Sequence, residues 1–120
     1  MTSVVTQILI DGADVERLAA FWCEVLGWEV IGHDDQDVEI GPGDGGAHRV
    51  SIMFEKVPEP KTIKNRVHLD IKANDGDQDA EVERLLALGA SRVDIGQGDV
   101  SWVVLADPEG NEFCVLAGSP

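Results

Sequence analysis

The chain has few basic residues and no long apolar run. Its 120 residues include only 9 lysines and arginines against 23 aspartates and glutamates, a formal net charge of −14. Because this charge repels phosphate backbones and anionic lipids, nucleic acid and membranes are not expected partners. No apolar stretch approaches the roughly 20 residues that span a bilayer, and Met1–Thr6 lacks the basic and apolar regions of a secretory leader. We expect a soluble, cytoplasmic protein.

Cysteine is also scarce, since only Cys23 and Cys114 are present. Two cysteines form at most one bridge, which excludes a dense disulfide framework, and we expect both to be free thiols. The excess of acidic residues has two interpretations: a solvated surface that aids solubility, or a field that favours a cationic or neutral small ligand.

An internal repeat is the clearest positive feature. The residues Val-Glu-Arg-Leu occur at 15–18 and again at 82–85, and each copy opens a helix-like stretch that Leu-Gly closes, at 26–27 and 88–89. Two similar modules usually pack about a pseudo-twofold axis, where a shared cleft can form.

A module of roughly 60 residues does not hold a core well by itself. We therefore predict one domain over residues 1–120, with module one at about 1–57, a linker at about 58–64 and module two at about 65–120. The linker contains Pro58-Glu59-Pro60-Lys61, which the two prolines keep extended.

Hydrophobic periodicity predicts the order strand, helix, strand, strand, strand in each module. One helix is expected between a capping Asp14 and a left-handed Gly27, and a shorter one follows a capping Asp79. The predicted strands are Val4–Ile10, Trp28–Ile31, Asp37–Ile40 and Arg49–Val57, then Arg66–Ala73, Arg92–Ile95, Ser101–Ala106 and Glu112–Ala117.

Three motifs accompany this order: Phe21-Trp22, Leu26-Gly27-Trp28, and the turn Asp107-Pro108-Glu109-Gly110-Asn111 before the last strand. The chain thereby resembles the vicinal oxygen chelate superfamily, which includes glyoxalase I, extradiol dioxygenases, fosfomycin-modifying enzymes and bleomycin-binding resistance proteins. The resemblance is to its compact glyoxalase-like members. It implies an α+β fold of two tandem βαβββ modules that form a cup-shaped mixed sheet, and a homodimer.

The resemblance also assigns positions to metal ligands. In metal-dependent relatives, ligands come from the first and last strands of each module, and the matching residues here are Gln7, Met53, His68 and Cys114. Glu112 lies two residues before the position of the last ligand. Because this set lacks a carboxylate, a magnesium, manganese or nickel lyase is disfavoured, and no metal or other cofactor is expected. If a metal were bound, its ligands would be Gln7, His68 and Glu112 or Cys114.

The candidate catalytic residues are His68, as a base near neutral pH, and Glu112, as its partner from another strand. Asp70 is the other candidate partner, but two residues along one strand is far for direct contact. The candidate substrate-binding residues are Gln7, Met53, Arg66, Asp70, Trp102 and Cys114.

Three functional hypotheses follow. The leading one is a glyoxalase-like protein that binds a small organic molecule in the cup between its modules, extended to a lyase or isomerase that moves a proton on a carbonyl compound. The alternative is a non-catalytic protein that sequesters a cationic drug, as bleomycin-resistance proteins do. The third is a divalent-metal lyase with a non-standard ligand set.

Overall fold

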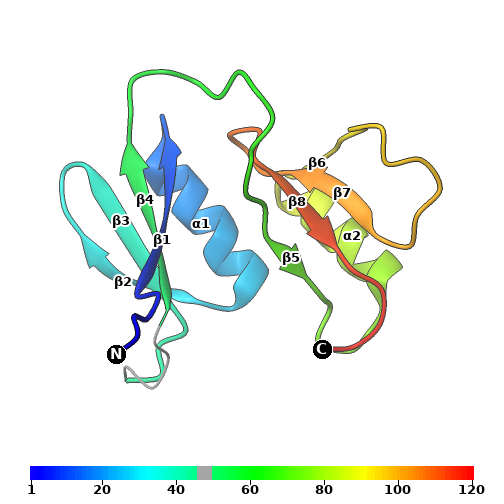
Figure 1. The fold of residues 1–120 in the computed structure, drawn as a ribbon, viewed down its shortest axis with the longest axis horizontal. Helices are drawn as coiled ribbons and strands as arrows, with labels where there is room; N and C mark the ends of the chain where they lie inside the picture. Colours follow the sequence, from blue (N-terminus) through cyan, green and yellow to red (C-terminus); the bar gives the residue numbers. More distant parts are fainter. Residues whose placement is uncertain (46–49) are drawn as a thin grey trace. The chain divides into compact units, whose positions relative to one another are not determined.

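The computed structural model describes residues 1–45 and 50–120, which form two compact units, Met1–Pro60 and Lys61–Pro120. Each unit contains one four-stranded sheet and one helix (Figure 1). Among the described residues, no helix has the length and apolar character needed to cross a membrane.

The first unit is a mixed sheet with one helix against it. In chain order its elements are β1 (Gln7–Gly12), α1 (Val15–Leu26), β2 (Glu29–His33), β3 (Asp37–Gly41) and β4 (Ser51–Lys56). The strands lie in the order β1-β4-β3-β2, in which only the pairing of β1 with β4 is parallel.

The second unit repeats this arrangement. Its elements are β5 (Asp70–Ile71), α2 (Gln78–Leu88), β6 (Ser91–Arg92), β7 (Val103–Ala106) and β8 (Glu112–Val115). The strand order is β5-β8-β7-β6, and again only the first pairing is parallel. The tandem βαβββ modules predicted from the sequence repeat are therefore confirmed, as is the α+β fold class.

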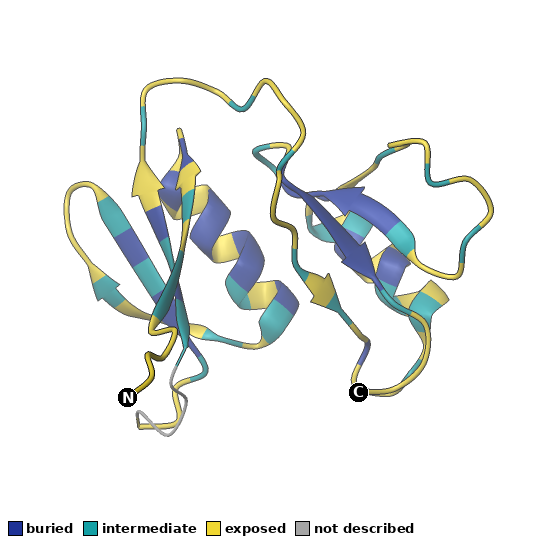
Figure 2. Ribbon diagram, in the orientation of Figure 1, coloured by how far each residue is buried: buried dark blue, intermediate teal, exposed yellow. Residues whose placement is uncertain are grey.

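Each sheet packs one face against its helix (Figure 2), and in the second sheet β8 is buried on both faces. In the first unit the buried side chains alternate along β3 and β4, so Val38, Ile40, Ile52 and Phe54 pack towards the helix residues Leu18 and Trp22. Phe21 contacts Trp22 edge to face, with ring centroids 5.3 Å apart. The alternate side chains of the same strands therefore lie on the uncovered face.

The helix ends follow local capping chemistry. Asp14 accepts a hydrogen bond from the backbone N–H of Arg17, and Gly27 takes the left-handed conformation at φ 68°, as predicted. The second helix begins earlier than predicted, because its cap is Asp77, which accepts from the N–H of Ala80. The prediction of Asp79 as the cap was wrong, since that residue lies in the first turn.

Several predicted strands are shorter in the structure. The largest correction is β5, predicted over Arg66–Ala73 but found only at Asp70–Ile71. This strand lies at the sheet edge and pairs only with β8, and Val67, an apolar residue of the alternating pattern, is 75% exposed. The first strand also starts late, at Gln7, with Val4 and Val5 exposed. The start predicted for the fourth strand, Arg49, lies outside the described residues.

Candidate functional site

A carboxylate on the uncovered face of the first sheet binds two polar side chains. Glu39 Oε2 accepts a hydrogen bond from Gln7 Nε2 at 2.9 Å and another from Ser51 Oγ at 2.6 Å. Strand register explains the cluster, because Gln7 is paired with Ser51 in the ladder of β1 and β4, and Glu39 is paired with Met53 on the other side of β4. Three strands therefore bring these groups together.

The environment of Glu39 favours its charged form. The hydrogen bond from Ser51 and then that from Gln7 lower the pKa of the Glu39 carboxyl, against the opposing effect of partial burial. Among the residues described, no lysine, arginine or histidine forms an ion pair with Glu39. The first unit thus presents a half-buried negative charge held by neutral donors.

Sequence reasoning selected Gln7 and Met53 but missed Glu39 and Ser51 as their neighbours. The alternation of Asp37-Val38-Glu39-Ile40 contains part of the signal, since it places Glu39 on the face opposite two apolar residues. The contact with Gln7 depends on the parallel register of β1 with β4, which local sequence does not specify.

A second cluster lies in the second unit, where His68, Asp70 and Cys114 meet. The distance from His68 Nδ1 to Asp70 Oδ1 is 3.4 Å, and one donor atom of each residue lies within 4.8 Å of the others. Asp70 and Cys114 are direct partners in the ladder of β5 and β8. His68 and Asp70 are 40% and 49% exposed, whereas Cys114 is buried.

The Cys114 thiol keeps its proton in this environment. Burial raises its pKa most, and the charge of Asp70 and a hydrogen bond to that carboxylate raise it further, while Lys64 has a weaker opposing effect. The protonated thiol of Cys114 therefore forms a hydrogen bond with the Asp70 carboxylate, next to the imidazole of His68. A cation bound there would favour release of that proton.

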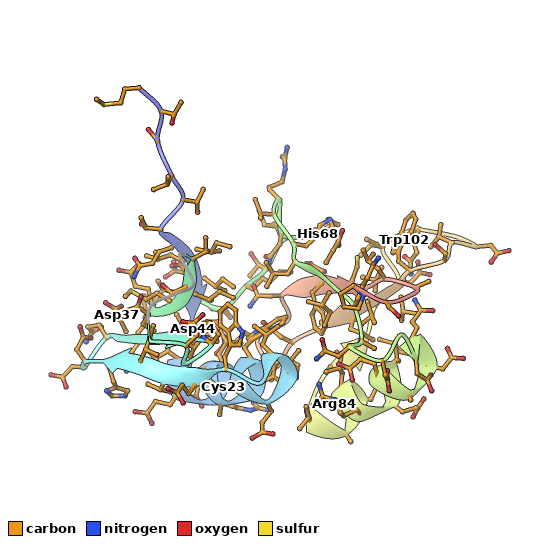
Figure 3. The ribbon with its side chains drawn as sticks, turned by 90° about the horizontal axis from the view of Figure 1, so that it is seen from below. Cys23, Asp37, Asp44, His68, Arg84 and Trp102 are labelled. Carbon is orange, nitrogen blue, oxygen red and sulfur yellow. The ribbon has the colours of Figure 1, made fainter. Side chains whose placement is uncertain are left out.

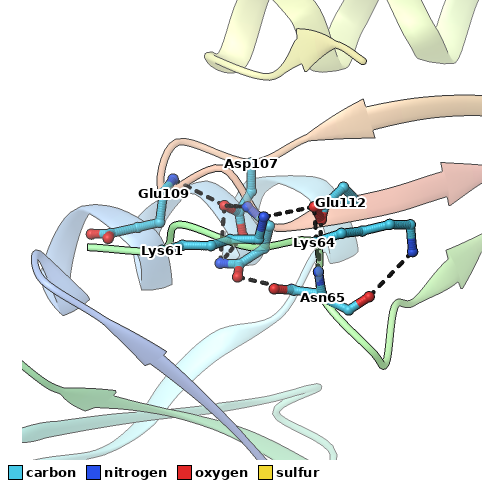
Figure 4. A network of polar contacts seen from close by, with 7 residues as sticks. Lys61, Lys64, Asn65, Asp107, Glu109 and Glu112 are labelled. Carbon is cyan, nitrogen blue, oxygen red and sulfur yellow. Dashed lines mark hydrogen bonds and ion pairs between the residues drawn. The ribbon is translucent and has the colours of Figure 1, made fainter. Parts of the chain in front are cut away.

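Glu112 has a different environment from the one predicted. Its Oε1 accepts from Lys61 Nζ at 2.6 Å, and both its oxygens accept from the backbone N–H of Asn65, at 3.4 and 3.2 Å (Figure 4). Within the described chain it forms no hydrogen bond or ion pair with His68. The carboxylate beside His68 is Asp70, so the expectation that the pair two residues apart is too distant was wrong.

The bonds to Glu112 continue into the turn before β8. Asn65 Nδ2 donates to Asn111 Oδ1 at 2.9 Å, and Asn111 Nδ2 donates to both oxygens of Asp107, at 3.1 and 3.0 Å (Figure 4). Asp107 also accepts from the backbone N–H groups of Glu109 and Asn111. The Asp-Pro-Glu-Gly-Asn turn is thus tied to the segment that enters the second unit.

Burial alone would raise the pKa of Glu112, but the hydrogen bonds from Lys61 and Asn65 and the charge of Lys61 outweigh it, so the pKa is lowered. Glu112 is therefore an ionised, buried group with its partners supplied by its own unit. This arrangement anchors residues 61–65, because the Glu112 carboxylate is bound by Lys61 and by the backbone N–H of Asn65.

The remaining candidates are more exposed. Trp102 is 40% exposed, and Figure 3 shows it with His68 on the side of the sheet away from α2, which carries Arg84. Arg66 is exposed and Met53 is half-buried. Both Cys23 and Cys114 are free thiols, as predicted.

Two tandem βαβββ units, each with one parallel and two antiparallel strand pairings, define a protein of the vicinal oxygen chelate type. The chain belongs to the glyoxalase-like domain family, whose model matches residues 7–116. No curated protein matches the chain significantly in sequence.

Solved structures share this fold at low sequence identity. A glyoxalase/bleomycin resistance protein/dioxygenase family enzyme from Burkholderia phytofirmans PsJN is 20% identical with a TM-score of 0.72, and the match covers 94% of this chain and 97% of that one. The fosfomycin resistance protein FosX from Listeria monocytogenes, complexed with Mn(II) and a sulfate ion, is 18% identical with a TM-score of 0.73, covering 99% and 93%. The oxidase ChaP-H2 is 17% identical with a TM-score of 0.68, covering 98% and 94%.

The side chains of this chain do not fit a manganese site of the kind that the resemblance implies. Mn(II) prefers carboxylate, carbonyl and imidazole donors, whereas the matching positions include the thioether of Met53 and the buried thiol of Cys114. Glu112, the nearby carboxylate, is bound by Lys61. Among the described residues, His68, Asp70 and Cys114 form a group that could hold a divalent ion.

Proposed function

We propose that the protein binds a small organic molecule that carries a positively charged group, and that Glu39 is the anchor for that group. The observation that supports this proposal is the carboxylate of Glu39, ionised and presented by Gln7 and Ser51 without a cationic partner among the described residues. A fixed, half-buried charge of this kind is stabilised when a ligand of opposite charge reaches it.

The surroundings of Glu39 suit an organic ligand. Met53, its ladder partner, is half-buried, and Leu9, which pairs with Met53 on the other side, is 50% exposed. Ligand sites commonly combine apolar surface with a few fixed polar groups, and this face has both. The net charge of −14 would also increase the local concentration of a cationic ligand.

Sequestration of a cationic drug is the form of this function that needs no chemistry, and bleomycin is its natural probe, because a bleomycin-resistance name occurs among the structural relatives. Isothermal titration of the metal-free protein with metal-free bleomycin tests it. We expect binding that weakens as salt is raised, and a loss of about tenfold in affinity for Glu39→Gln, which corresponds to about 1.4 kcal/mol.

The matched control is Glu59→Gln, which removes one negative charge from an exposed position outside the sheets. It should leave the affinity nearly unchanged. Equal losses for the two variants would show that only the overall charge matters and would refute Glu39 as the anchor.

Proton transfer on a carbonyl compound, as a lyase or isomerase would perform it, is a second candidate function. The observation that favours it is the contact of His68 with Asp70, because it places a carboxylate beside an imidazole, the side chain that most often transfers protons in enzymes. The predicted partnership with Glu112 is not retained, since Lys61 and Asn65 hold that carboxylate. Turnover of carbonyl substrates that Asp70→Asn lowers and Glu112→Gln spares would support this function.

A further inference from the structure

The second unit contains a nitrogen, an oxygen and a sulfur donor within reach of one ion. His68 Nδ1 lies 3.4 Å from Asp70 Oδ1, and no two of the three donor atoms of His68, Asp70 and Cys114 are more than 4.8 Å apart. Donors around tetrahedral zinc lie roughly 3.3–3.8 Å apart, given bonds of about 2.0 Å to nitrogen or oxygen and about 2.3 Å to sulfur. A contraction of at most about 1.5 Å in any pair of donors brings the three donors to these separations.

The backbone already holds these donors together. Asp70 and Cys114 are direct ladder partners, and the N–H of Cys114 donates to the carbonyl of Leu69 at 2.9 Å. That bond fixes the residue between His68 and Asp70 to the neighbouring strand. Main-chain hydrogen bonds therefore position Asp70 and Cys114. His68 lies two residues before Asp70, so its side chain is on the same side of the chain.

The chemistry of the donors selects among divalent ions. A cysteine thiolate is a soft ligand that favours zinc, whereas manganese favours oxygen and imidazole. A bound zinc ion would displace the thiol proton of Cys114, and the thiolate and the Asp70 carboxylate together would balance its charge of two. Lys64 is the nearby cation that acts on Cys114, and it is exposed, with its ammonium bound to the carbonyl of Asn65.

We propose that His68, Asp70 and Cys114 form a zinc-binding site contained entirely in the second unit. This set differs from the ligands that the resemblance implies, because it includes Asp70 and omits Gln7 and Glu112, which are engaged with Glu39 and Lys61. Three protein ligands leave the fourth position of a tetrahedral ion for water or another small ligand. In this assignment His68 is a metal ligand and not a proton acceptor.

Metal-free protein, prepared by dialysis against a chelator, is titrated with zinc chloride, manganese chloride and cobalt chloride. We expect one equivalent of zinc to bind, with an affinity at least about a hundredfold above that for manganese, as the thiolate ligand requires. Cobalt should give the near-ultraviolet band of a thiolate bound to cobalt, which reports on Cys114 directly. Zinc should also raise the melting temperature, because it binds the folded state.

The variants Cys114→Ser, His68→Gln and Asp70→Asn should each weaken zinc binding by more than about tenfold, the smaller of the losses seen for outer-shell partners of metal ligands. The matched control is Cys23→Ser, which removes the other thiol, on α1, and should leave zinc binding and the cobalt band unchanged. Because His68 and Asp70 are partly exposed, their variants remain informative if the buried Cys114 variant fails to fold.

A cobalt band that survives in Cys114→Ser but disappears in Cys23→Ser would overturn the assignment, as would equal affinities for zinc and manganese. Absence of zinc binding in the folded wild-type protein would also overturn it. The inference does not rest on the proposed binding of an organic cation, since the zinc titration contains no organic ligand. The bleomycin titration uses metal-free protein and the Glu39→Gln variant. The zinc site and the Glu39 anchor can therefore be refuted independently of each other.

Discussion

Two glutamates of this chain show how partners decide the role of a side chain. Among the described residues, Glu39 accepts side-chain hydrogen bonds from the neutral Gln7 and Ser51, and we propose that its charge binds a ligand. Glu112 is 7% exposed and is neutralised by the ammonium of Lys61. Both carboxyl groups have a lowered pKa, but the first is a candidate anchor and the second is a structural tie.

The lowered pKa of Glu39 predicts a specific pH dependence. Above the ordinary pKa of about 4.5 the carboxylate is ionised in both folded and unfolded chains, and its contribution to stability is fully present. As the pH falls below that value, the unfolded chain takes up the proton first, and the contribution disappears as the pH passes the lower folded pKa. The stability difference between wild type and Glu39→Gln should therefore be largest near neutrality and shrink in acid.

Urea denaturation at a series of pH values measures that difference. Glu59→Gln serves as the control, because it removes a carboxylate of the same kind from an exposed position outside the sheets. A difference in the free energy of unfolding between wild type and Glu39→Gln that stays constant with pH would contradict the prediction.

The tie between Lys61 and Glu112 predicts a second effect at the residue scale. Lys61→Met keeps the length of the side chain but removes the ammonium partner of the buried Glu112, which keeps its hydrogen bonds to backbone N–H groups such as that of Asn65. We expect the free energy of unfolding to fall by about 2 kcal/mol. Lys64→Met removes a charge from the same segment without touching Glu112, so its effect should stay within about 0.5 kcal/mol. Chemical denaturation with equal losses for the two would refute the structural role.

At the scale of elements, the two modules differ in how well local sequence defines them. In the first, α1 has a strong apolar stripe with Leu18 and Trp22 at its centre, and its predicted cap and stop are both correct. In the second, the helix buries fewer side chains, notably Val82 and Leu85, and two aspartates precede it while a third, Asp79, lies in its first turn. Neighbouring residues of similar capping ability make the helix start ambiguous from sequence.

The position of the second cap is directly testable. Asp77→Ala removes the side chain that accepts from the N–H of Ala80, and should lower the free energy of unfolding by about 1 kcal/mol. Asp79→Ala removes only a charge in the first turn, so a loss of about 0.3 kcal/mol is expected. Urea denaturation of both variants distinguishes them, and a larger loss for Asp79→Ala would restore the sequence-based assignment.

At the scale of the whole molecule, the net charge of −14 acts on every part of the chain. Like charges repel more strongly in the compact state than in the extended one, so the folded protein is destabilised by its own field. Salt weakens that repulsion, because the screening length falls from about 30 Å at roughly 0.01 M to about 8 Å at roughly 0.15 M.

We therefore expect the melting temperature at neutral pH to rise when sodium chloride is increased over that range. Scanning calorimetry measures it, and potassium chloride should act equally, since the effect is one of ionic strength. A melting temperature that falls or stays constant would show that attractive ion pairs, such as that of Lys61 with Glu112, outweigh the overall repulsion.

Homodimerisation, which the resemblance implies, stays a prediction. Two strands at edges of the first sheet carry exposed apolar side chains that a second copy can bury. These are Leu9 in β1 and Val30 and Ile31 in β2. Sedimentation equilibrium should give about twice the chain mass of 12.9 kDa. A single species of chain mass at all concentrations would refute it.

The sequence by itself determined the two modules, their element order and the first helix. The Val-Glu-Arg-Leu repeat, the apolar period of α1 and the alternation on β3 and β4 are local patterns, so each can be interpreted without knowing what the element packs against. The same alternation places His68 and Asp70 on one face of a strand. It does not predict the distance between their side chains.

Only the tertiary structure decided which polar groups meet. Parallel pairing joins strands far apart in the chain, so it is the register of β1 on β4 that places Gln7 near Glu39, and the register of β5 on β8 that places Asp70 next to Cys114. The partner of Glu112 was decided in the same way, by a lysine 51 positions earlier. Such contacts depend on how distant segments pack, and a local sequence pattern does not specify that packing.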